Sequence, residues 1–138
     1  MELHKKYKGD IAELVVAAKM VEMGWRVLFP YGENARYDLV GEQNGRFIRI
    51  QVKYTTPKNG VMDTNCRSSN NWSIIHYTPA DIDFIAAYNP QDREVYFIPA
   101  HKINKSTFKL RLDEAKNNQK LKINMAKDFL GLNMRDIA

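Results

Sequence analysis

The stretch RFIRIQVKYTT, residues 46–56, has the alternating pattern of a β-strand whose two faces differ in polarity. The side chains of one face are apolar: Ile48, Ile50, Val52 and Tyr54. Those of the other face are mostly polar: Phe47, Arg49, Gln51 and Lys53. Because successive side chains on a strand point to opposite sides, an arginine, an amide and an ammonium share one face. The pattern predicts a strand that packs on a core with one face and presents functional groups with the other.

The whole chain has the size and composition of one globular domain. It has 138 residues, of which 44% are hydrophobic and 27% charged, and we treat 1–138 as a single domain with a core over about 8–99. No apolar run approaches the ~20 residues that span a membrane, and we see no secretory signal at the start of the chain. The single cysteine, Cys66, cannot form an internal disulfide, which favours a reduced, cytoplasmic setting.

Positive charge is concentrated at the end of the chain. The formal net charge is +5, and residues 101–138 carry nine Lys/Arg against four Asp/Glu, so this third accounts for the excess. We interpret 100–138 as a basic C-terminal extension of the core. A polyanionic partner such as nucleic acid fits this distribution, and so does an ordinary lysine-rich surface.

Residues 10–24 are predicted to form a helix. Apolar residues recur at the 3.6-residue period, and further apolar positions widen the stripe until the helix is apolar nearly all round. We therefore expect it to be largely buried. Asp10 suits the N-cap and Gly24 the stop.

The remaining elements suggest one sheet with a helix on it. Strands are expected, each between turn residues, at 25–30, 36–42, 46–55, 81–88 and 94–99. The polar segment 57–73 is expected to be a long loop. Later segments are predicted as a strand (106–112), a polar loop (114–122) and a short helix (125–132). This order predicts an α/β fold of the α+β type, with a buried N-terminal helix on a mostly antiparallel or mixed central sheet.

Four polar residues are predicted to converge on this sheet. Gln51 and Lys53 leave the same face of their strand, and a turn at 43–45 would bring Asp38 beside Gln51 in a hairpin. On the helical wheel Glu13 lies about 180° from Glu22, so it points away from the solvated side. Glu13 has an alternative role, because Asp10-x-x-Glu13 fits a capping box.

This set suits hydrolysis of a phosphodiester. A hard cation such as Mg²⁺, with Mn²⁺ as a substitute, prefers oxygen ligands, and Asp38, Gln51, Glu13 and the main-chain carbonyl of Val52 supply them. Lys53 would orient or deprotonate the attacking water or stabilise the transition state. The simpler interpretation of Asp38 and Lys53 is a cross-strand ion pair.

The same residues resemble a known family. The helix with Ala12-Glu13, the aspartate in RYDLV (36–40) and the strand with Gln51-Val52-Lys53 look like the core of PD-(D/E)XK nucleases. The likeness covers roughly residues 8–130 and is nearest to group I intron-associated (homing-type) endonucleases, with archaeal Holliday-junction resolvases next. Tyr37 stands where the family has proline, and Gln51 replaces an acid.

The resemblance implies a restriction-endonuclease-like core and Mg²⁺-dependent cleavage of double-stranded DNA. Cutting both strands needs two active sites, so we expect a homodimer or homotetramer. Alternatives are a Holliday-junction resolvase, and an inactive DNA-binding module, which the neutral side chain at position 51 would allow.

Candidate DNA contacts lie outside this set. Asn and Arg side chains read base edges in the major groove, and a lysine-rich segment can hold phosphates. The candidates are Arg49, Asn65, Arg67, Asn70, Asn71, Trp72, Lys116, Lys120 and Lys122. A solvated loop and a lysine-rich surface have the same sequence pattern, and Arg49 could instead balance Asp38.

Overall fold

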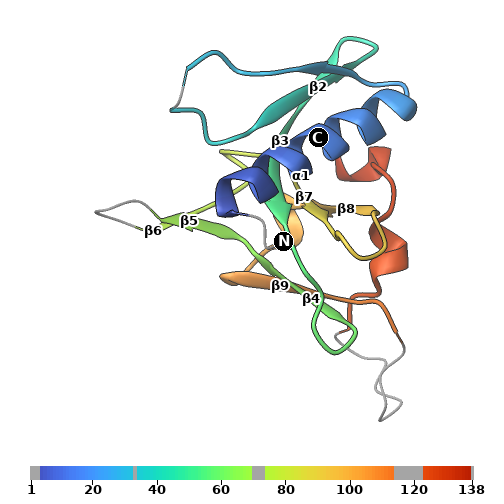
Figure 1. Ribbon diagram of the computed structural model, residues 1–138. Coiled ribbons are helices and arrows are strands. Elements are labelled where there is room, and N and C mark those ends of the chain that lie inside the picture. Colours follow the sequence, from blue (N-terminus) through green and yellow to red (C-terminus); the bar gives the residue numbers. More distant parts are fainter. Residues whose placement is uncertain (1–3, 33, 70–73, 114–122, 138) are drawn as a thin grey trace.

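The computed structural model describes residues 4–32, 34–69, 74–113 and 123–137, and its centre is a five-stranded sheet (Figure 1). The sheet has the order β1-β2-β3-β7-β8. Its strands are β1 (Arg26–Leu28), β2 (Leu39–Gln43), β3 (Arg46–Tyr54), β7 (Phe84–Tyr88) and β8 (Val95–Pro99). The β3–β7 pair is parallel and the other pairs are antiparallel. The predicted mixed sheet is confirmed, and the opening stretch is its central strand.

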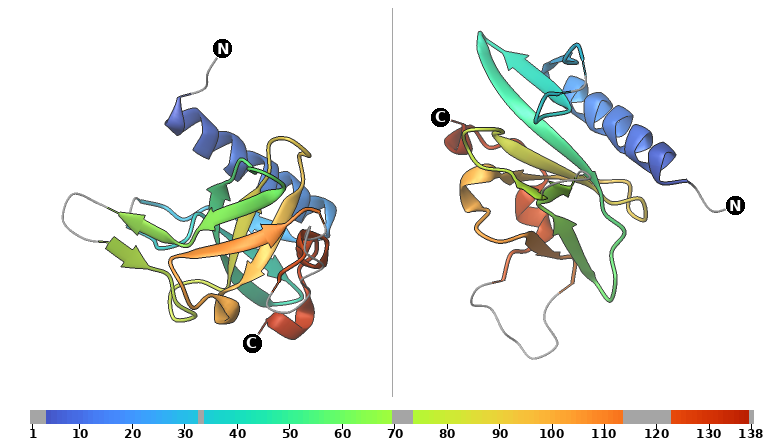
Figure 2. Two further views of the ribbon diagram at one scale, coloured as in Figure 1. Left: turned by 90° about the horizontal axis from the view of Figure 1, so that it is seen from below. Right: turned by 90° about the vertical axis from the view of Figure 1, so that its left-hand side faces the viewer.

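Both faces of this sheet are covered. The helix α1 (Lys5–Glu22) lies along one face, where Val16 and Met20 pack with Ile48 and Ile50 of β3. The other face carries a second core, in which Ile85 of β7 meets side chains from the later parts of the chain. Figure 2 shows the two layers on opposite sides of the sheet. The strands β7 and β8 are buried along their whole length because they face a core on each side.

The hairpin of β2 and β3 determines where the polar residues lie. Asn44 and Gly45 connect the strands with φ values of 53° and 78°, the backbone of a two-residue turn in which both central residues have positive φ. The register then pairs Leu39 with Ile50. Asp38, one residue before β2, is therefore placed beside Gln51, as the sequence predicted.

The start of α1 differs from the prediction. The helix begins at Lys5, five residues before the expected cap, and the His4 side chain accepts a hydrogen bond from the Lys6 N–H at 3.2 Å. Asp10 and Glu13 are consequently interior helix residues, which rules out the capping box. Gly24, with φ of 90°, follows the end of the helix as expected.

The outer side of α1 also differs from the prediction. Only Ala12, Val16 and Met20 are fully buried, whereas Leu14 is 67% exposed. The expectation of a largely buried helix is wrong for this side, because the described chain provides no layer outside α1. The helix lies close to the sheet on its inner side, where a Cβ at Gly41 would be 2.5 Å from the Met20 methyl carbon.

The segment 57–73, expected to be a loop, contains two strands. β4 (Val61–Asn65) pairs with β9 (Thr107–Arg111), and β5 (Arg67–Ser69) pairs with β6 (Ile74–His76). Three short 3₁₀ helices complete the described chain: η1 (Ala100–Lys102), η2 (Ala126–Phe129) and η3 (Met134–Asp136). Within the described ranges, no helix is long and apolar enough to cross a membrane.

Candidate active site

Asp38 is held on the edge of β3 by its side chain. Its Oδ2 accepts a hydrogen bond from the Val52 N–H at 2.7 Å, and its own N–H donates to the Ile50 carbonyl at 2.8 Å. Burial raises the pKa of the Asp38 carboxyl above its usual range, while the Val52 N–H and the charge of Lys53 oppose the rise. The hydrogen bonds thus fix the position of the Asp38 side chain. Its ionisation is unfavourable in the buried site and becomes more favourable when a cation binds next to it.

The edge of β3 beside Asp38 also presents a backbone carbonyl. β2 begins at Leu39, so β3 has no strand partner on this side beyond Ile50. In a strand the N–H and C=O of one residue point to the same side. Because the Val52 N–H donates to Asp38 on this edge, the Val52 carbonyl lies on the same edge. This position suits the predicted role of Val52 as a main-chain ligand.

Glu13 approaches the same edge from α1. The Glu13 side chain is half-buried, and its pKa is raised, first by burial and then by the negative charges of Asp38 and Asp10. Two carboxylates whose pKa values are both raised are a poor combination without a partner cation. Their closeness is the electrostatic feature expected of a cation site.

Lys53 is positioned by the β5 segment and an aromatic ring. Its Nζ donates to the Arg67 carbonyl at 3.0 Å and lies 5.4 Å from the centroid of the Tyr77 ring. Burial lowers the pKa of Lys53 although Asp38 opposes this. Among the ion pairs of the described residues none joins Lys53 to Asp38, so the simple cross-strand pair is not formed.

The donors at this edge fit a hard divalent cation. Nowhere in the described ranges do three His, Cys, Asp or Glu side chains come together, so a protein-only cage is not available there. Two carboxylates, an amide oxygen at Gln51 and the Val52 carbonyl match the oxygen ligands that Mg²⁺ takes while it keeps several waters. The nearby Cys66 thiol is buried and its pKa is raised to about 11, which leaves it protonated and unsuited to metal binding.

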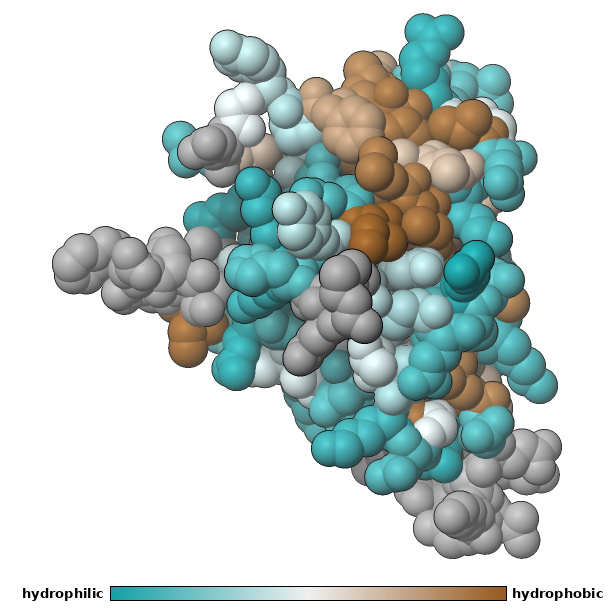
Figure 3. Space-filling view, in the orientation of Figure 1, coloured by the Kyte–Doolittle hydropathy of each residue, from teal (hydrophilic) through white to brown (hydrophobic). Residues whose placement is uncertain are grey.

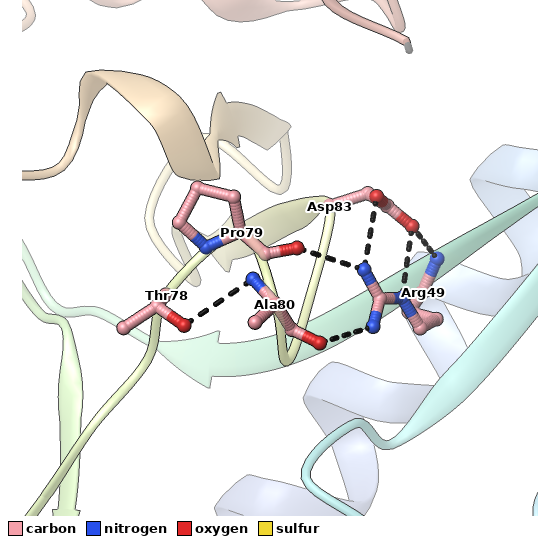
Figure 4. A network of polar contacts seen from close by, with 5 residues as sticks. All are labelled: Arg49, Thr78, Pro79, Ala80 and Asp83. Carbon is pink, nitrogen blue, oxygen red and sulfur yellow. Dashed lines mark hydrogen bonds and ion pairs between the residues drawn. The ribbon is translucent and has the colours of Figure 1, made fainter.

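Arg49 has a structural role that the sequence did not reveal. Its guanidinium pairs with the Asp83 carboxylate at 3.2 Å and donates to the carbonyls of Pro79 and Ala80 at 3.0 and 2.7 Å (Figure 4). The Arg49 N–H donates to Asp83 as well, at 2.7 Å. These bonds join β3 to the segment that leads into β7. The partner of Arg49 is thus Asp83 and not Asp38, and its donors face protein groups.

A basic cleft opens beside Lys53. It has a volume of about 540 Å³ and lies between the start of α1, the end of β3 and the β4–β5 segment. Asn65 and Arg67, two predicted DNA contacts, line it, and so do Lys5 and Lys8. Lys5 and Lys8 were not among the predicted DNA contacts because the predicted helix began at Asp10. Their i, i+3 spacing within a longer helix was the available signal.

The other predicted DNA contacts cannot be placed. All six lie in the segments 70–73 and 114–122, outside the described residues. They stay predictions, together with the roles assigned to Asn65 and Arg67. The six are Asn70, Asn71, Trp72, Lys116, Lys120 and Lys122.

The mixed sheet with α1 packed on it is a restriction-endonuclease-like fold, and comparison with known proteins agrees. The sequence model of the PD-(D/E)XK endonucleases matches residues 3–132. The chain belongs to this family.

Two known proteins illustrate the relationship. The chain is similar to Protein 5.3 of Escherichia phage T7, with 28% identity over 85 residues that span 61% of this chain and 72% of the phage protein. Its fold is similar to that of the bacterial homing endonuclease I-Ssp6803I, with a TM-score of 0.72 and 28% identity. That match covers 92% of this chain and 88% of the homing endonuclease.

Proposed function

We propose that the protein is a Mg²⁺-dependent endonuclease that hydrolyses phosphodiester bonds in double-stranded DNA, of the site-specific homing type. The observation that carries the proposal is the position of Asp38, whose carboxylate is fixed on the Val52 N–H beside Glu13 and Lys53. The family match supports endonuclease chemistry. The homing type is supported by the similarity to I-Ssp6803I over nearly the whole chain.

The first part of the mechanism is the binding of the cation. Asp38, Glu13, Gln51 and the Val52 carbonyl would hold Mg²⁺ or Mn²⁺, which when bound neutralises charge on the phosphate and lowers the pKa of a water. The Asp38–Val52 bond keeps one carboxylate oxygen fixed, so the other is free to bind. A cation would also offset the negative charge of Asp38, which together with burial raises the pKa of Glu13.

Lys53 provides the second part of the mechanism. Its lowered pKa increases the fraction of Lys53 that is unprotonated and can accept a proton, and the protonated form can stabilise negative charge on a phosphate oxygen. The Arg67 carbonyl and the Tyr77 ring hold its Nζ next to the cleft. Lys53 therefore orients or deprotonates the attacking water, or stabilises the transition state.

The cleft beside Lys53 has the charge that a DNA backbone requires. Lys5, Lys8 and Arg67 line it together with Lys53, against one carboxylate, Asp63. Each lysine or arginine that contacts a phosphate releases about one counterion, so binding should weaken steeply as salt increases. Asn65 lines the cleft from β4 and would contact a base or a sugar of the bound DNA.

A second candidate function follows from one residue. Gln51 carries no charge where the family pattern has an acid, so the site has one carboxylate fewer. If this loss prevents cation binding, the protein would be a DNA-binding module that keeps the nuclease core without its activity.

One substrate panel distinguishes these functions. Supercoiled plasmids, linear duplexes and a synthetic four-way junction are incubated with the protein and Mg²⁺, Mn²⁺ or EDTA. We expect cleavage of duplex DNA at one or few sites with either metal and none with EDTA. Retardation of DNA without cleavage across the panel would favour the binding module, and cleavage confined to the junction would indicate a resolvase.

A further inference from the structure

The outer side of α1 carries an apolar stripe that the described chain leaves uncovered. Figure 3 shows apolar side chains gathered over this face of the molecule. Tyr7, Leu14 and Val21 are 61%, 67% and 59% exposed. A helix on the surface of a globular protein normally directs polar residues outward, so a stripe of this kind marks a contact surface.

The spacing of the stripe is that of a helix–helix seam. Its members are separated by four, three, four and three residues, an average of 3.5. They are Tyr7, Ile11, Leu14, Ala18 and Val21, of which Ile11 is half-buried against the core and the other four are exposed. The same period repeats over the length of the helix, which suits another helix lying along it better than a single inserted side chain.

The charges at the two ends of α1 identify the partner orientation. Three lysines (Lys5, Lys6 and Lys8) lie at the N-terminal end, where no acidic residue is found in the first turn, and Glu22 ends the helix. Both arrangements oppose the helix dipole, which is positive at the N-terminus and negative at the C-terminus. A second α1 lying antiparallel would place Glu22 and a negative helix end near Lys6, the lysine of this group that does not line the cleft. Lys19, the basic residue of the last turn, is directed to Glu94 of the same chain at 3.9 Å.

We propose that the outer side of α1 is the interface of a two-fold symmetric homodimer in which the two α1 helices pack antiparallel along Tyr7, Ile11, Leu14, Ala18 and Val21. A parallel arrangement would bring the lysines of the two copies together, which is unfavourable. The antiparallel pair is self-complementary in charge and lets Leu14 meet the small Ala18 of the second copy. An isologous interface of this kind closes after two chains.

This dimer also meets a requirement of the proposed function, on which this part of the reasoning rests. One domain reaches one strand of a duplex at a time, so cutting both strands needs a second active site. Lys5 and Lys8 at the start of α1 line the cleft, and antiparallel helices carry the two clefts at opposite ends of the pair. With a rise of 1.5 Å per residue the two helix starts would be about 27 Å apart along the axis.

The mass of the full chain in solution tests the interface without DNA or metal. We expect the wild type to sediment at twice 16.0 kDa and Leu14→Glu to dissociate at least about 30-fold more readily, as for a central interface residue. The matched control is Leu130→Glu, because Leu130 is an exposed leucine (42%) beside η2 on the other side of the sheet. Unchanged far-ultraviolet circular dichroism would show that both variants fold.

Charge reversal tests the orientation. Glu22→Lys should weaken the dimer, and Lys6→Glu combined with Glu22→Lys should restore it. A monomeric wild type would overturn the proposal. So would a dimer whose dissociation constant is the same in the wild type, Leu14→Glu and Leu130→Glu. Dimer loss in the double variant would overturn the antiparallel arrangement. Because mass is measured apart from cleavage, an inactive dimer or an active monomer would separate this proposal from the proposed function.

Discussion

The Asp38 carboxylate and the Val52 N–H are joined by a hydrogen bond of 2.7 Å at the point where β2 begins and β3 loses its neighbour. This bond occupies one oxygen of Asp38 and leaves the other available at the strand edge. It also places the carboxylate next to the Val52 carbonyl, which faces the same side. One strand edge thus supplies two of the four expected ligands, and the predictions below follow from this arrangement.

The neutral side chain at position 51 should limit the affinity for metal. We expect Gln51→Glu to lower the Mg²⁺ concentration that gives half-maximal cleavage by roughly tenfold, because an added carboxylate strengthens a hard-cation site. Gln51→Leu removes the amide oxygen and should raise that concentration. Metal titrations of the cleavage rate measure both. Identical midpoints for the wild type and both variants would show that position 51 is not a ligand.

Lys53 should depend on the ring of Tyr77 for its position and pKa. Lys53→Ala is expected to reduce kcat by about 100-fold, as for loss of a proton-transfer group. Tyr77→Leu should reduce kcat less and shift the pH–rate profile, whereas Tyr77→Phe keeps the ring and should resemble the wild type. If the pH–rate profile of Tyr77→Leu is the same as that of the wild type, the contact with the Tyr77 ring does not determine the pKa of Lys53.

The ionised Asp38 should destabilise the metal-free protein. Burial raises the pKa of the Asp38 carboxyl in the folded chain above its usual 3.8. Below pH 3.8 the carboxyl is protonated in both states and no stability is lost. As pH rises from there through the raised pKa, the folded state loses stability. Asp38→Asn keeps an oxygen for the Val52 N–H without the charge. Its Tm should exceed that of the wild type at about pH 7 and the difference should vanish towards acid pH.

The control for this effect is Mg²⁺. Bound cation favours the carboxylate, so added Mg²⁺ should raise the Tm of the wild type and leave that of Asp38→Asn nearly unchanged. Thermal unfolding followed across pH in EDTA and in Mg²⁺ gives both comparisons. A lower Tm for Asp38→Asn at neutral pH in EDTA would be inconsistent with the burial of an unpaired charge.

Arg49 should matter for stability more than for catalysis. Arg49→Met removes the guanidinium donors of the half-buried Asp83 carboxylate and of two carbonyls and leaves Asp83 only the Arg49 main-chain N–H. We expect a loss of about 2 kcal/mol in the free energy of unfolding. Arg26→Ala, at an exposed arginine of β1, is the control and should change little. Denaturant unfolding measures the loss. A stable Arg49→Met protein with weakened DNA binding would assign Arg49 to the DNA instead.

Local sequence patterns predicted the central part of the fold. The alternation at 46–56 identified β3 and its two faces, and the Asn44-Gly45 turn determined the register that brings Asp38 to Gln51. These features could be predicted because they depend on a short hairpin. Glu13 was assigned to the same region from the helical wheel. Its pKa is raised first by burial and then by the charge of Asp38, so the two carboxylates are close.

The parts that the sequence did not reveal depend on distant partners. β4 has apolar residues at only two of five positions, and its partner β9 begins at Thr107, more than 40 residues later. The start of α1 was missed because Lys5, Lys6 and Lys8 lack an apolar period. Asp83 was not recognised as the partner of Arg49, since their contact arises only when β3 and β7 pair in parallel.

The rate of duplex cleavage as a function of Mg²⁺ tests the role of Asp38 most directly. The proteins compared are the wild type, Asp38→Ala and Asp128→Ala, the last removing an exposed carboxylate in η2. We predict that Asp38→Ala lowers the rate at least about 100-fold at every Mg²⁺ concentration, as for loss of a principal ligand, while Asp128→Ala cleaves like the wild type. Cleavage by Asp38→Ala at the rate of Asp128→Ala would contradict the placement of the active site at the edge of β3.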